Sequence, residues 1–216
     1  GSLSRAARLA GVPRVSVDHQ RFLVECDLSS LPAHLRRHAA AMGVIVRAVQ
    51  PEPDASVVSS FYAPPLKDTR RDVRQVGVFL RQAVLSARPE AGEHLLVYCR
   101  RVGCERILDV VERAGVPALV YGLGERPSRG AVRFRPLSER GFVHDLATCR
   151  ALLSTAGNQL LGEALHLGKP ILAIPEQGNR EQEINAHFLE QSGAGRTARL
   201  QELGTTLLRD FLSTSE

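Results

Sequence analysis

The polar residues best placed for chemistry lie in one stretch of the chain, 151–195. A turn of small residues, Ser154-Thr155-Ala156-Gly157, stands immediately before a helical pattern. Such a turn presents backbone N–H groups at a helix N-terminus, which is a general binding site for anions. Glu163 follows inside the helix, and composition alone favours an exposed helix carboxylate. The second polar loop of the stretch, 175–182, contains a carboxylate and an amide, Glu181 and Gln182.

The same stretch predicts the elements that position these side chains. Apolar runs at 151–153 and 171–174 suit buried strands, and apolar residues at helical spacing fill 160–167. The order strand, turn, helix, strand, loop, helix is typical of parallel α/β architecture. Ligands of such sheets bind beyond the carboxyl ends of the strands, where the loops 154–158 and 175–182 would both lie.

From His94 onward the chain has the same rhythm. Strands are predicted at 94–99, 117–121 and 131–134, and helices at 105–114 and 139–149. Together with 151–195 they predict an α/β domain, a Rossmann-like parallel sheet of five or six strands with flanking helices.

The preceding residues contain too few strands for a comparable domain. We expect a helix at 3–10, strands at 12–17, 44–49 and 57–61, and a helix at 30–42. Prolines and charges at 62–76 indicate a connecting segment. The predicted organisation is a partial α/β unit at 1–61, an interdomain linker at 62–81 and the Rossmann-like domain at 82–216.

Histidines are the candidate catalytic or metal-binding groups of the first part. His19 follows a predicted strand in Asp18-His19-Gln20, where α/β folds place functional groups, but Asp18 could equally cap the next helix. His34 and His38 are four residues apart and would share a helix face. No third ligand accompanies them, so a solvated face is favoured and no metal site is predicted.

Composition excludes several classes of protein. The 216 residues are 44% hydrophobic and 24% charged, as in globular domains. No apolar run is long enough for a membrane span, and the start does not resemble a signal peptide. The four cysteines lack metal-ligand spacing, and Cys99 and Cys149 are expected to be buried free thiols. A reducing, cytoplasmic location follows from that expectation.

The net charge of +5 comes mainly from arginine. The arginines are scattered, without an aromatic platform, which disfavours a nucleic-acid partner and leaves phosphates or peripheral contact with an anionic membrane surface open. Gly122-Leu123-Gly124 lacks the third glycine of a dinucleotide fingerprint, and no Gly-Lys-Ser/Thr is present. A dehydrogenase and a P-loop NTPase are therefore disfavoured.

The motifs of 151–195 together resemble the donor-binding half of GT-B glycosyltransferases. The likeness rests on Gly157 in its turn, Glu163, Gly168-Lys169-Pro170, Pro175, and Glu181-Gln182 before Asn185-Ala186. The chain is similar to the peptidoglycan N-acetylglucosaminyltransferase, to UDP-sugar transferases and especially to a related bacterial and archaeal family of predicted glycosyltransferases. Outside this stretch, Asp18-His19-Gln20 resembles the motif that closes the amino-terminal domain, and Gly77 to Arg81 resembles the interdomain Gly-x-x-x-Arg.

The resemblance implies a nucleotide-sugar donor, with UDP as the expected nucleotide, and a role for each matching residue. The donor diphosphate would be surrounded by Thr155, Gly157, Asn158 and Gln159. Glu163 would accept hydrogen bonds from the two ribose hydroxyls. Hydroxyls of the transferred sugar would be held by Glu181 and Gln182. The base would lie against Arg135, Pro136, Leu137 and Ser138. Thr155 stands where plant relatives have a histidine facing the phosphates.

The resemblance also implies inverting transfer to an acceptor hydroxyl, without a metal or other cofactor. Complete relatives carry an amino-terminal acceptor domain with a glycine-rich loop, and residues 1–61 resemble only its tail. We therefore expect a fragment that binds the donor and is inactive alone. The acceptor and the catalytic base are unassigned, with His19 a candidate for the base. The alternatives are a non-catalytic nucleotide-binding or regulatory module and a sugar-nucleotide epimerase.

Overall fold

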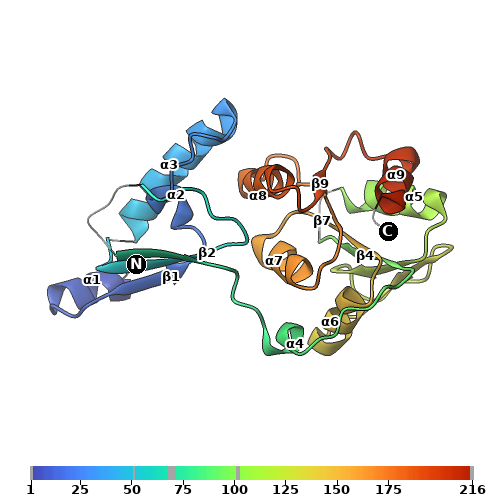
Figure 1. Ribbon diagram of the computed structural model, residues 1–216, viewed down its shortest axis with the longest axis horizontal. Coiled ribbons are helices and arrows are strands. Elements are labelled where there is room, and N and C mark those ends of the chain that lie inside the picture. Colours follow the sequence, from blue (N-terminus) through green and yellow to red (C-terminus); the bar gives the residue numbers. More distant parts are fainter. Residues whose placement is uncertain (1, 51, 68–71, 101–102, 215–216) are drawn as a thin grey trace. The chain divides into compact units, whose positions relative to one another are not determined.

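The computed structural model describes residues 2–50, 52–67, 72–100 and 103–214. The chain divides into two compact units, Gly1–Phe79 and Leu80–Glu216, each with its own parallel sheet and helices (Figure 1). The predicted α/β class is therefore confirmed.

The first unit has a three-stranded parallel sheet in the order β1-β2-β3. Its elements are α1 (Ser2–Leu9), β1 (Val15–Asp18), α2 (Phe22–Glu25), α3 (Ala33–Val49), β2 (Ala55–Ser59) and β3 (Asp72–Val76). β1 and β2 are joined by the segment that contains α2 and α3, as in a parallel crossover.

The strand predicted at 44–49 is wrong, because α3 continues to Val49. The buried residues of α3 follow a helical repeat, Leu35, Ala39, Gly43 and Val46. A Cβ at Gly43 would lie 3.0 Å from the carbonyl oxygen of Leu23, so glycine allows α3 to pack closely on α2. Packing against α2 thus overrides the β-propensity of the run that begins at Val44.

The linker predicted at 62–81 contains the strand β3, so it is not a connecting segment throughout. β3 pairs in parallel with β2 from Ala55↔Asp72 to Ser59↔Val76 and belongs to the first unit. Its exposed and half-buried residues alternate, and it contains no continuous apolar run, which is why the pattern was missed. Residues 68–71 of the predicted linker lie outside the described residues.

The second unit has a six-stranded parallel sheet in the order β6-β5-β4-β7-β8-β9. Its strands are β4 (Leu95–Tyr98), β5 (Ala118–Tyr121), β6 (Val132–Phe134), β7 (Ala151–Ser154), β8 (Ile171–Ala173) and β9 (Arg196–Thr197). Its helices are α4 (Gln82–Leu85), α5 (Cys104–Ala114), α6 (Glu139–Ala147), α7 (Asn158–His166), α8 (Arg180–Gln191) and α9 (Thr205–Ser213).

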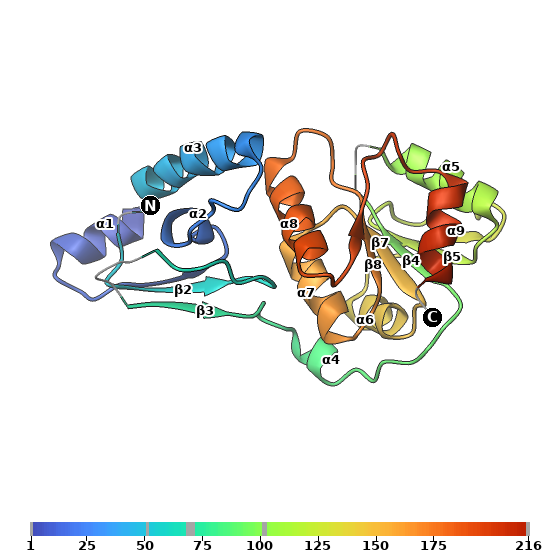
Figure 2. The ribbon, with the colours of Figure 1, turned by 45° about the horizontal axis from the view of Figure 1, so that its top comes forward.

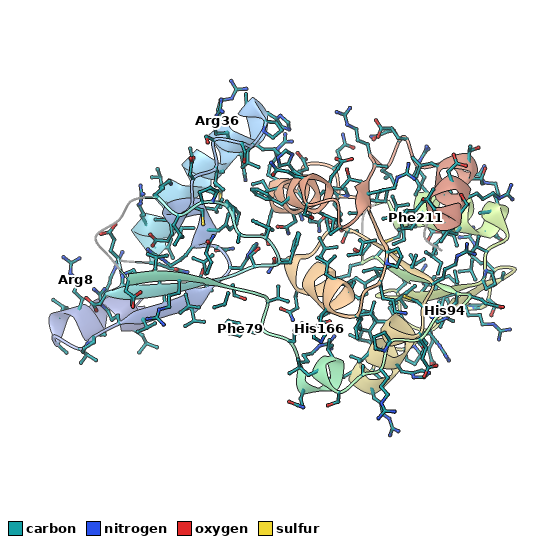
Figure 3. The ribbon with its side chains drawn as sticks, viewed as in Figure 1. Arg8, Arg36, Phe79, His94, His166 and Phe211 are labelled. Carbon is teal, nitrogen blue, oxygen red and sulfur yellow. The ribbon has the colours of Figure 1, made fainter. Side chains whose placement is uncertain are left out.

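Helices cover both faces of this sheet. Figure 2 shows α5 and α9 on one face and α6, α7 and α8 on the other. Strand residues such as Val97, Val120 and Leu153 share a buried cluster with α5 and α9, including Phe211 of α9 (Figure 3). On the opposite face the rings of Tyr98 and Tyr121 contact Phe142 of α6.

The strand order places a topological switch point between β4 and β7. From β4 the chain passes through α5 to β5 on one side, whereas β7 lies on the other side of β4 and leads into α7. Tyr98 and Ser154, the last residues of β4 and β7, are register partners. Because the chain leaves these two strands toward opposite faces, open α/β sheets bind ligands at this edge. The small-residue turn at 154–157 lies there.

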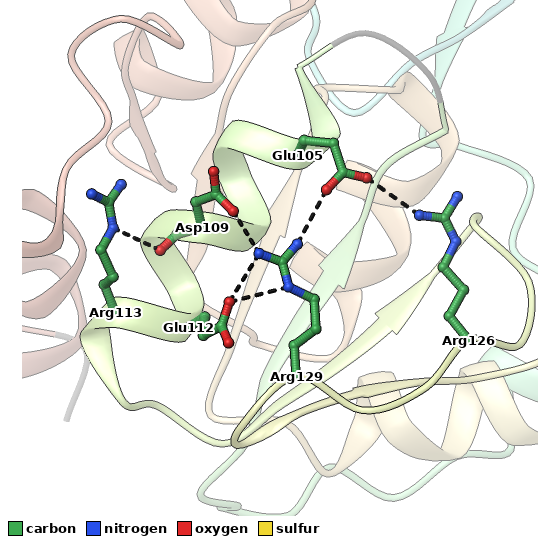
Figure 4. Close-up of polar contacts among 6 residues, drawn as sticks. All are labelled: Glu105, Asp109, Glu112, Arg113, Arg126 and Arg129. Atoms are coloured by element: carbon green, nitrogen blue, oxygen red, sulfur yellow. Dashed lines mark hydrogen bonds and ion pairs between the residues drawn. The ribbon is translucent and has the colours of Figure 1, made fainter.

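An ion-pair network holds the connection between β5 and β6 against α5 (Figure 4). The guanidinium of Arg129 contacts three carboxylates of α5, those of Glu105, Asp109 and Glu112. Arg126 adds a contact to Glu105 at 3.3 Å. β6 follows directly, so this network anchors the strand that leads into residues 135–138.

Candidate functional site

The turn after β7 has an uncommon backbone. Ala156 has a φ of +65°, and every other described residue with positive φ is a glycine. Its carbonyl oxygen accepts a hydrogen bond of 2.9 Å from Nδ2 of Asn185, a fully buried residue of α8. Gly157 follows as the N-cap of α7 and is exposed, and a Cβ placed on it would meet nothing within 4 Å. The start of α7 thus offers backbone N–H groups with open space beside them.

The second polar loop meets this turn through Gln182. Its Nε2 lies 3.5 Å from Oγ1 of Thr155, and its Oε1 accepts a hydrogen bond of 2.8 Å from the backbone N–H of Glu176. Its backbone N–H donates to Oδ1 of Asn179, the N-cap of α8. The structure therefore brings Thr155 and Gln182 together, whereas Glu181 lies exposed on the first turn of α8.

Glu163 is not the exposed carboxylate that composition favoured, since its relative exposure is 1%. Arg81 binds both of its oxygens, with Nε 2.9 Å from Oε1 and Nη2 2.6 Å from Oε2. Nε2 of Gln159 donates a third hydrogen bond, of 3.0 Å, to Oε1. The hydrogen bond to Glu163 raises the pKa of Arg81 above its ordinary value. A buried carboxylate is stable here because a cation and an amide compensate its charge.

Arg81 also connects Glu163 to the start of α6. Its guanidinium carbon lies 5.9 Å from the centre of the Phe142 ring, and its Nη1 lies 3.8 Å from Oε1 of Glu139. Glu139 comes directly after the segment 135–138. The structure therefore brings the end of that segment and Glu163 to the same arginine.

The segment 135–138 is fixed at both ends. The backbone N–H of Arg135 donates to the carbonyl of Val120, and Oγ of Ser138 caps α6 by accepting from the N–H of Gly141. The exposed side chain of Leu137 lies between them.

The buried carboxylate of Asp145 contacts this segment at Arg135. Oδ2 of Asp145 accepts a hydrogen bond of 2.6 Å from the hydroxyl of Tyr121 and lies 3.5 Å from Nε of Arg135. Burial, together with the hydrogen bond to Asp145, raises the pKa of Tyr121 well above its ordinary value. Local sequence patterns do not predict this pair, because Tyr121 and Asp145 are 24 positions apart and come from different elements.

A further polar atom at the edge of the sheet was not predicted from the sequence. Oγ of Ser154 is buried and has no hydrogen-bond partner among the described residues. Ser154 ends β7 immediately before the turn at 155–157. Unsatisfied buried hydroxyls are uncommon in folded proteins.

His19 belongs to the first unit. Its ring stacks on Phe22, and Nδ1 lies 3.1 Å from the carbonyl oxygen of Ser59. Asp18 caps the following turn, since its Oδ1 accepts a hydrogen bond of 2.8 Å from the N–H of Arg21. Beneath this turn Arg21 and Glu25 form an ion pair whose side chains are both fully buried.

The described residues contain no candidate for a metal site or a membrane span. No group of three or more His, Cys, Asp or Glu residues in the described part of the chain is arranged to hold a metal ion. Within the same residues, no helix has the length and apolar character to cross a membrane. The four cysteines are free and buried, and burial raises the pKa of Cys149 to about 11.

Comparison with known proteins gives a consistent family. The model of the family described as glycosyl transferase family 1 matches residues 3–215. An uncharacterized glycosyltransferase of Methanosarcina mazei is 44% identical over 84 residues, which are 35% of this chain and 22% of that protein.

Solved structures share the fold. The MurG structure of Acinetobacter baumannii aligns with 98% of this chain and 60% of its own, at 15% identity and a TM-score of 0.61. The Arabidopsis thaliana protein UGT89C1, solved with UDP, aligns with 99% of this chain and 60% of its own, at 15% identity and a TM-score of 0.64. The chain thus spans less than two thirds of the length of both.

Proposed function

The chain belongs to glycosyl transferase family 1, and we propose that it is the donor-binding part of a glycosyltransferase that uses a UDP-sugar. The observation that carries the proposal is the cluster at the switch point of the second unit. It comprises a helix N-terminus, a buried carboxylate and a capped segment beside one sheet edge. These three parts suit the diphosphate, the ribose and the base of one nucleotide.

The diphosphate would lie at the start of α7. The turn Thr155–Gly157 and the first residues of the helix, Asn158 and Gln159, offer backbone N–H groups and the positive end of the helix dipole. These groups would also stabilise the negative charge that grows on the leaving nucleotide.

The ribose would bind Glu163. A carboxylate has about four lone-pair positions, and in the structure Arg81 and Gln159 occupy three, two of them on Oε1. A diol that donates to both oxygens therefore has to displace one of these partners from Oε1. Donor binding is accordingly an exchange of hydrogen bonds at Glu163, in which Arg81 or Gln159 gives way.

The sugar and the base would occupy the two remaining sides. Gln182 contacts Thr155 and would be close to groups attached to the diphosphate, and Glu181 is exposed beside it in the sequence. The base would rest on Arg135, Pro136, Leu137 and Ser138, which are held by Asp145 and by the capped end of α6. UDP is preferred because relatives of this fold, such as the Arabidopsis protein, were solved with it.

Inverting transfer to an acceptor hydroxyl remains part of the proposal. A base would deprotonate that hydroxyl, which would attack the anomeric carbon as the nucleoside diphosphate leaves. The first unit would be the tail of an acceptor domain, with His19 as the candidate base. We propose a cytoplasmic location, in keeping with the four free thiols.

Titration calorimetry of the chain with UDP tests the proposal. Glu163→Gln keeps the size of the side chain and removes its charge, so UDP affinity should fall by about 1–3 kcal/mol, or roughly 5- to 150-fold. Glu93→Gln, on the exposed surface before β4, is the matched control and should bind as the wild type does. A wild-type chain without UDP affinity, or a Glu163→Gln chain with wild-type affinity, would contradict the proposal.

A further inference from the structure

The left-handed conformation of Ala156 is unfavourable in free energy, so other contacts of the fold have to stabilise it. A φ of +65° brings the Cβ of an L-residue close to its own backbone, and glycine adopts it more easily. Ala156 is also fully buried, so its conformation is set by its surroundings and not by solvent. Strained residues of this kind persist where neighbouring groups hold them, often at ligand sites.

Asn185 is a neighbouring group that holds Ala156. It is fully buried on α8, and its Nδ2 donates a hydrogen bond of 2.9 Å to the carbonyl oxygen of Ala156. α8 follows β8 in the chain, so this contact joins the turn after β7 to a helix 29 residues further on.

The position of the Ala156 carbonyl determines the direction of the next N–H. A trans peptide is planar, and its C=O and N–H point in opposite directions. When Asn185 draws the Ala156 oxygen toward α8, the N–H of Gly157 is turned away from α8. Gly157 is exposed and has open space beside its Cα. The N–H of Gly157 is therefore set as a donor at the start of α7.

We propose that Asn185 is a positioning residue for phosphate binding. Its side-chain amide holds Ala156 in the left-handed conformation and thereby orients the N–H of Gly157 toward a diphosphate. The inference rests on the proposed function of the second unit, and it adds a residue that does not touch the donor. It also gives a reason for an amide at this position, since a carboxylate cannot donate to the carbonyl.

Measured affinities for UDP and uridine distinguish a role of Asn185 in phosphate binding from a role in the stability of the fold alone. Asn185→Leu removes the donor and keeps a side chain of similar size. Loss of one oriented hydrogen bond to a charged group should weaken UDP binding about 10-fold, while uridine, which has no phosphate, should bind within about 2-fold of wild type. The inference would be overturned if Asn185→Leu lowered the affinities for UDP and for uridine by the same factor, or lowered neither.

Ala156→Gly provides a second variant that depends on the same mechanism. Glycine adopts the left-handed conformation without the steric penalty, so the turn should need Asn185 less. Combined with Asn185→Leu, it should recover about half of the lost UDP binding energy, which is a coupling that double-mutant cycles measure. The inference would be overturned if the loss of UDP binding energy in the double variant were the sum of the losses in the two single variants.

A measurement on the wild-type chain keeps the test valid if Asn185→Leu does not fold. The amide resonance of Gly157 should shift during titration with UDP and stay in place with uridine. A Gly157 amide that does not respond to saturating UDP would overturn the inference while leaving the proposed function intact. A chain that binds neither UDP nor uridine would overturn both.

Discussion

The guanidinium of Arg81 binds both carboxylate oxygens of Glu163, at 2.9 and 2.6 Å. This bidentate pair joins the first residues of the second unit to the middle of α7, across 82 positions of the sequence. Glu163 is almost completely buried beneath it, whereas the side chain of Arg81 is 36% exposed. The predicted ribose ligand is therefore held in place by a partner that can move toward solvent.

Removing Arg81 should destabilise the second unit. Arg81→Met leaves the buried carboxylate with Gln159 alone, and with partial solvent screening of the pair the free energy of unfolding should fall by about 1–2 kcal/mol. Urea denaturation measures this change. Arg140→Met, on the exposed face of α6, should stay within about 0.5 kcal/mol of wild type. Adding Glu163→Gln to Arg81→Met should restore stability, and a further loss would argue that the pair is not the cause.

Gly157→Ala should weaken UDP binding more than it weakens the stability of the fold. Gly157 has φ −71° and ψ 127°, which alanine adopts readily, and its Cβ would enter open space. Because glycine is a better N-cap than alanine, the free energy of unfolding should fall by at most about 1 kcal/mol. UDP affinity should fall by roughly 10-fold, because the methyl group occupies space beside the expected diphosphate. Calorimetry and thermal melting measure the two effects.

Gly204→Ala is the matched control for that change. Gly204 is the N-cap of α9 and also has nothing within 4 Å of its Cβ position, but it lies at another helix. It should lower the free energy of unfolding by a similar amount and leave UDP affinity unchanged. Equal UDP affinity of Gly157→Ala and Gly204→Ala would remove the turn after β7 from the binding site.

Tyr121→Phe should loosen the segment 135–138. The change deprives the buried Asp145 of a hydrogen bond of 2.6 Å, and the free energy of unfolding should fall by about 1–3 kcal/mol at neutral pH. If the segment contacts the base, discrimination between UDP and CDP should also decrease. Denaturation and calorimetry test the two parts, and a destabilised variant with unchanged discrimination would argue against base recognition here.

The contribution of Tyr121 should also depend on pH. Its pKa is raised in the folded protein, chiefly by burial. Stability from a group with a raised pKa is fully present below the unfolded pKa of about 10 and is lost as the pH rises further. The difference in stability between wild type and Tyr121→Phe should therefore be constant from pH 7 to 9 and shrink above about pH 10. A difference that grows with pH would contradict this assignment.

Local patterns predicted β4 to β8 and α5 to α8 of the second unit, because these strands are mostly apolar runs and these helices have clear ends. The polar strand β9 and the helices α4 and α9 were not predicted. The strand β3 has no such run, and α3 carries β-branched residues through Val49, so the first unit was predicted less well. Glu163 was identified by resemblance to a family, but its burial depends on Arg81, a contact that no local pattern contains. Asn185 was visible only as part of a motif, and its bond to Ala156 required the fold.

The binding of UDP and 2′-deoxy-UDP by wild type and Glu163→Gln tests the central claim most directly. If Glu163 holds the ribose, wild type should prefer UDP by roughly 10-fold, and Glu163→Gln should bind the two nucleotides within about 2-fold of each other. The account would be contradicted if Glu163→Gln kept the full wild-type preference for UDP.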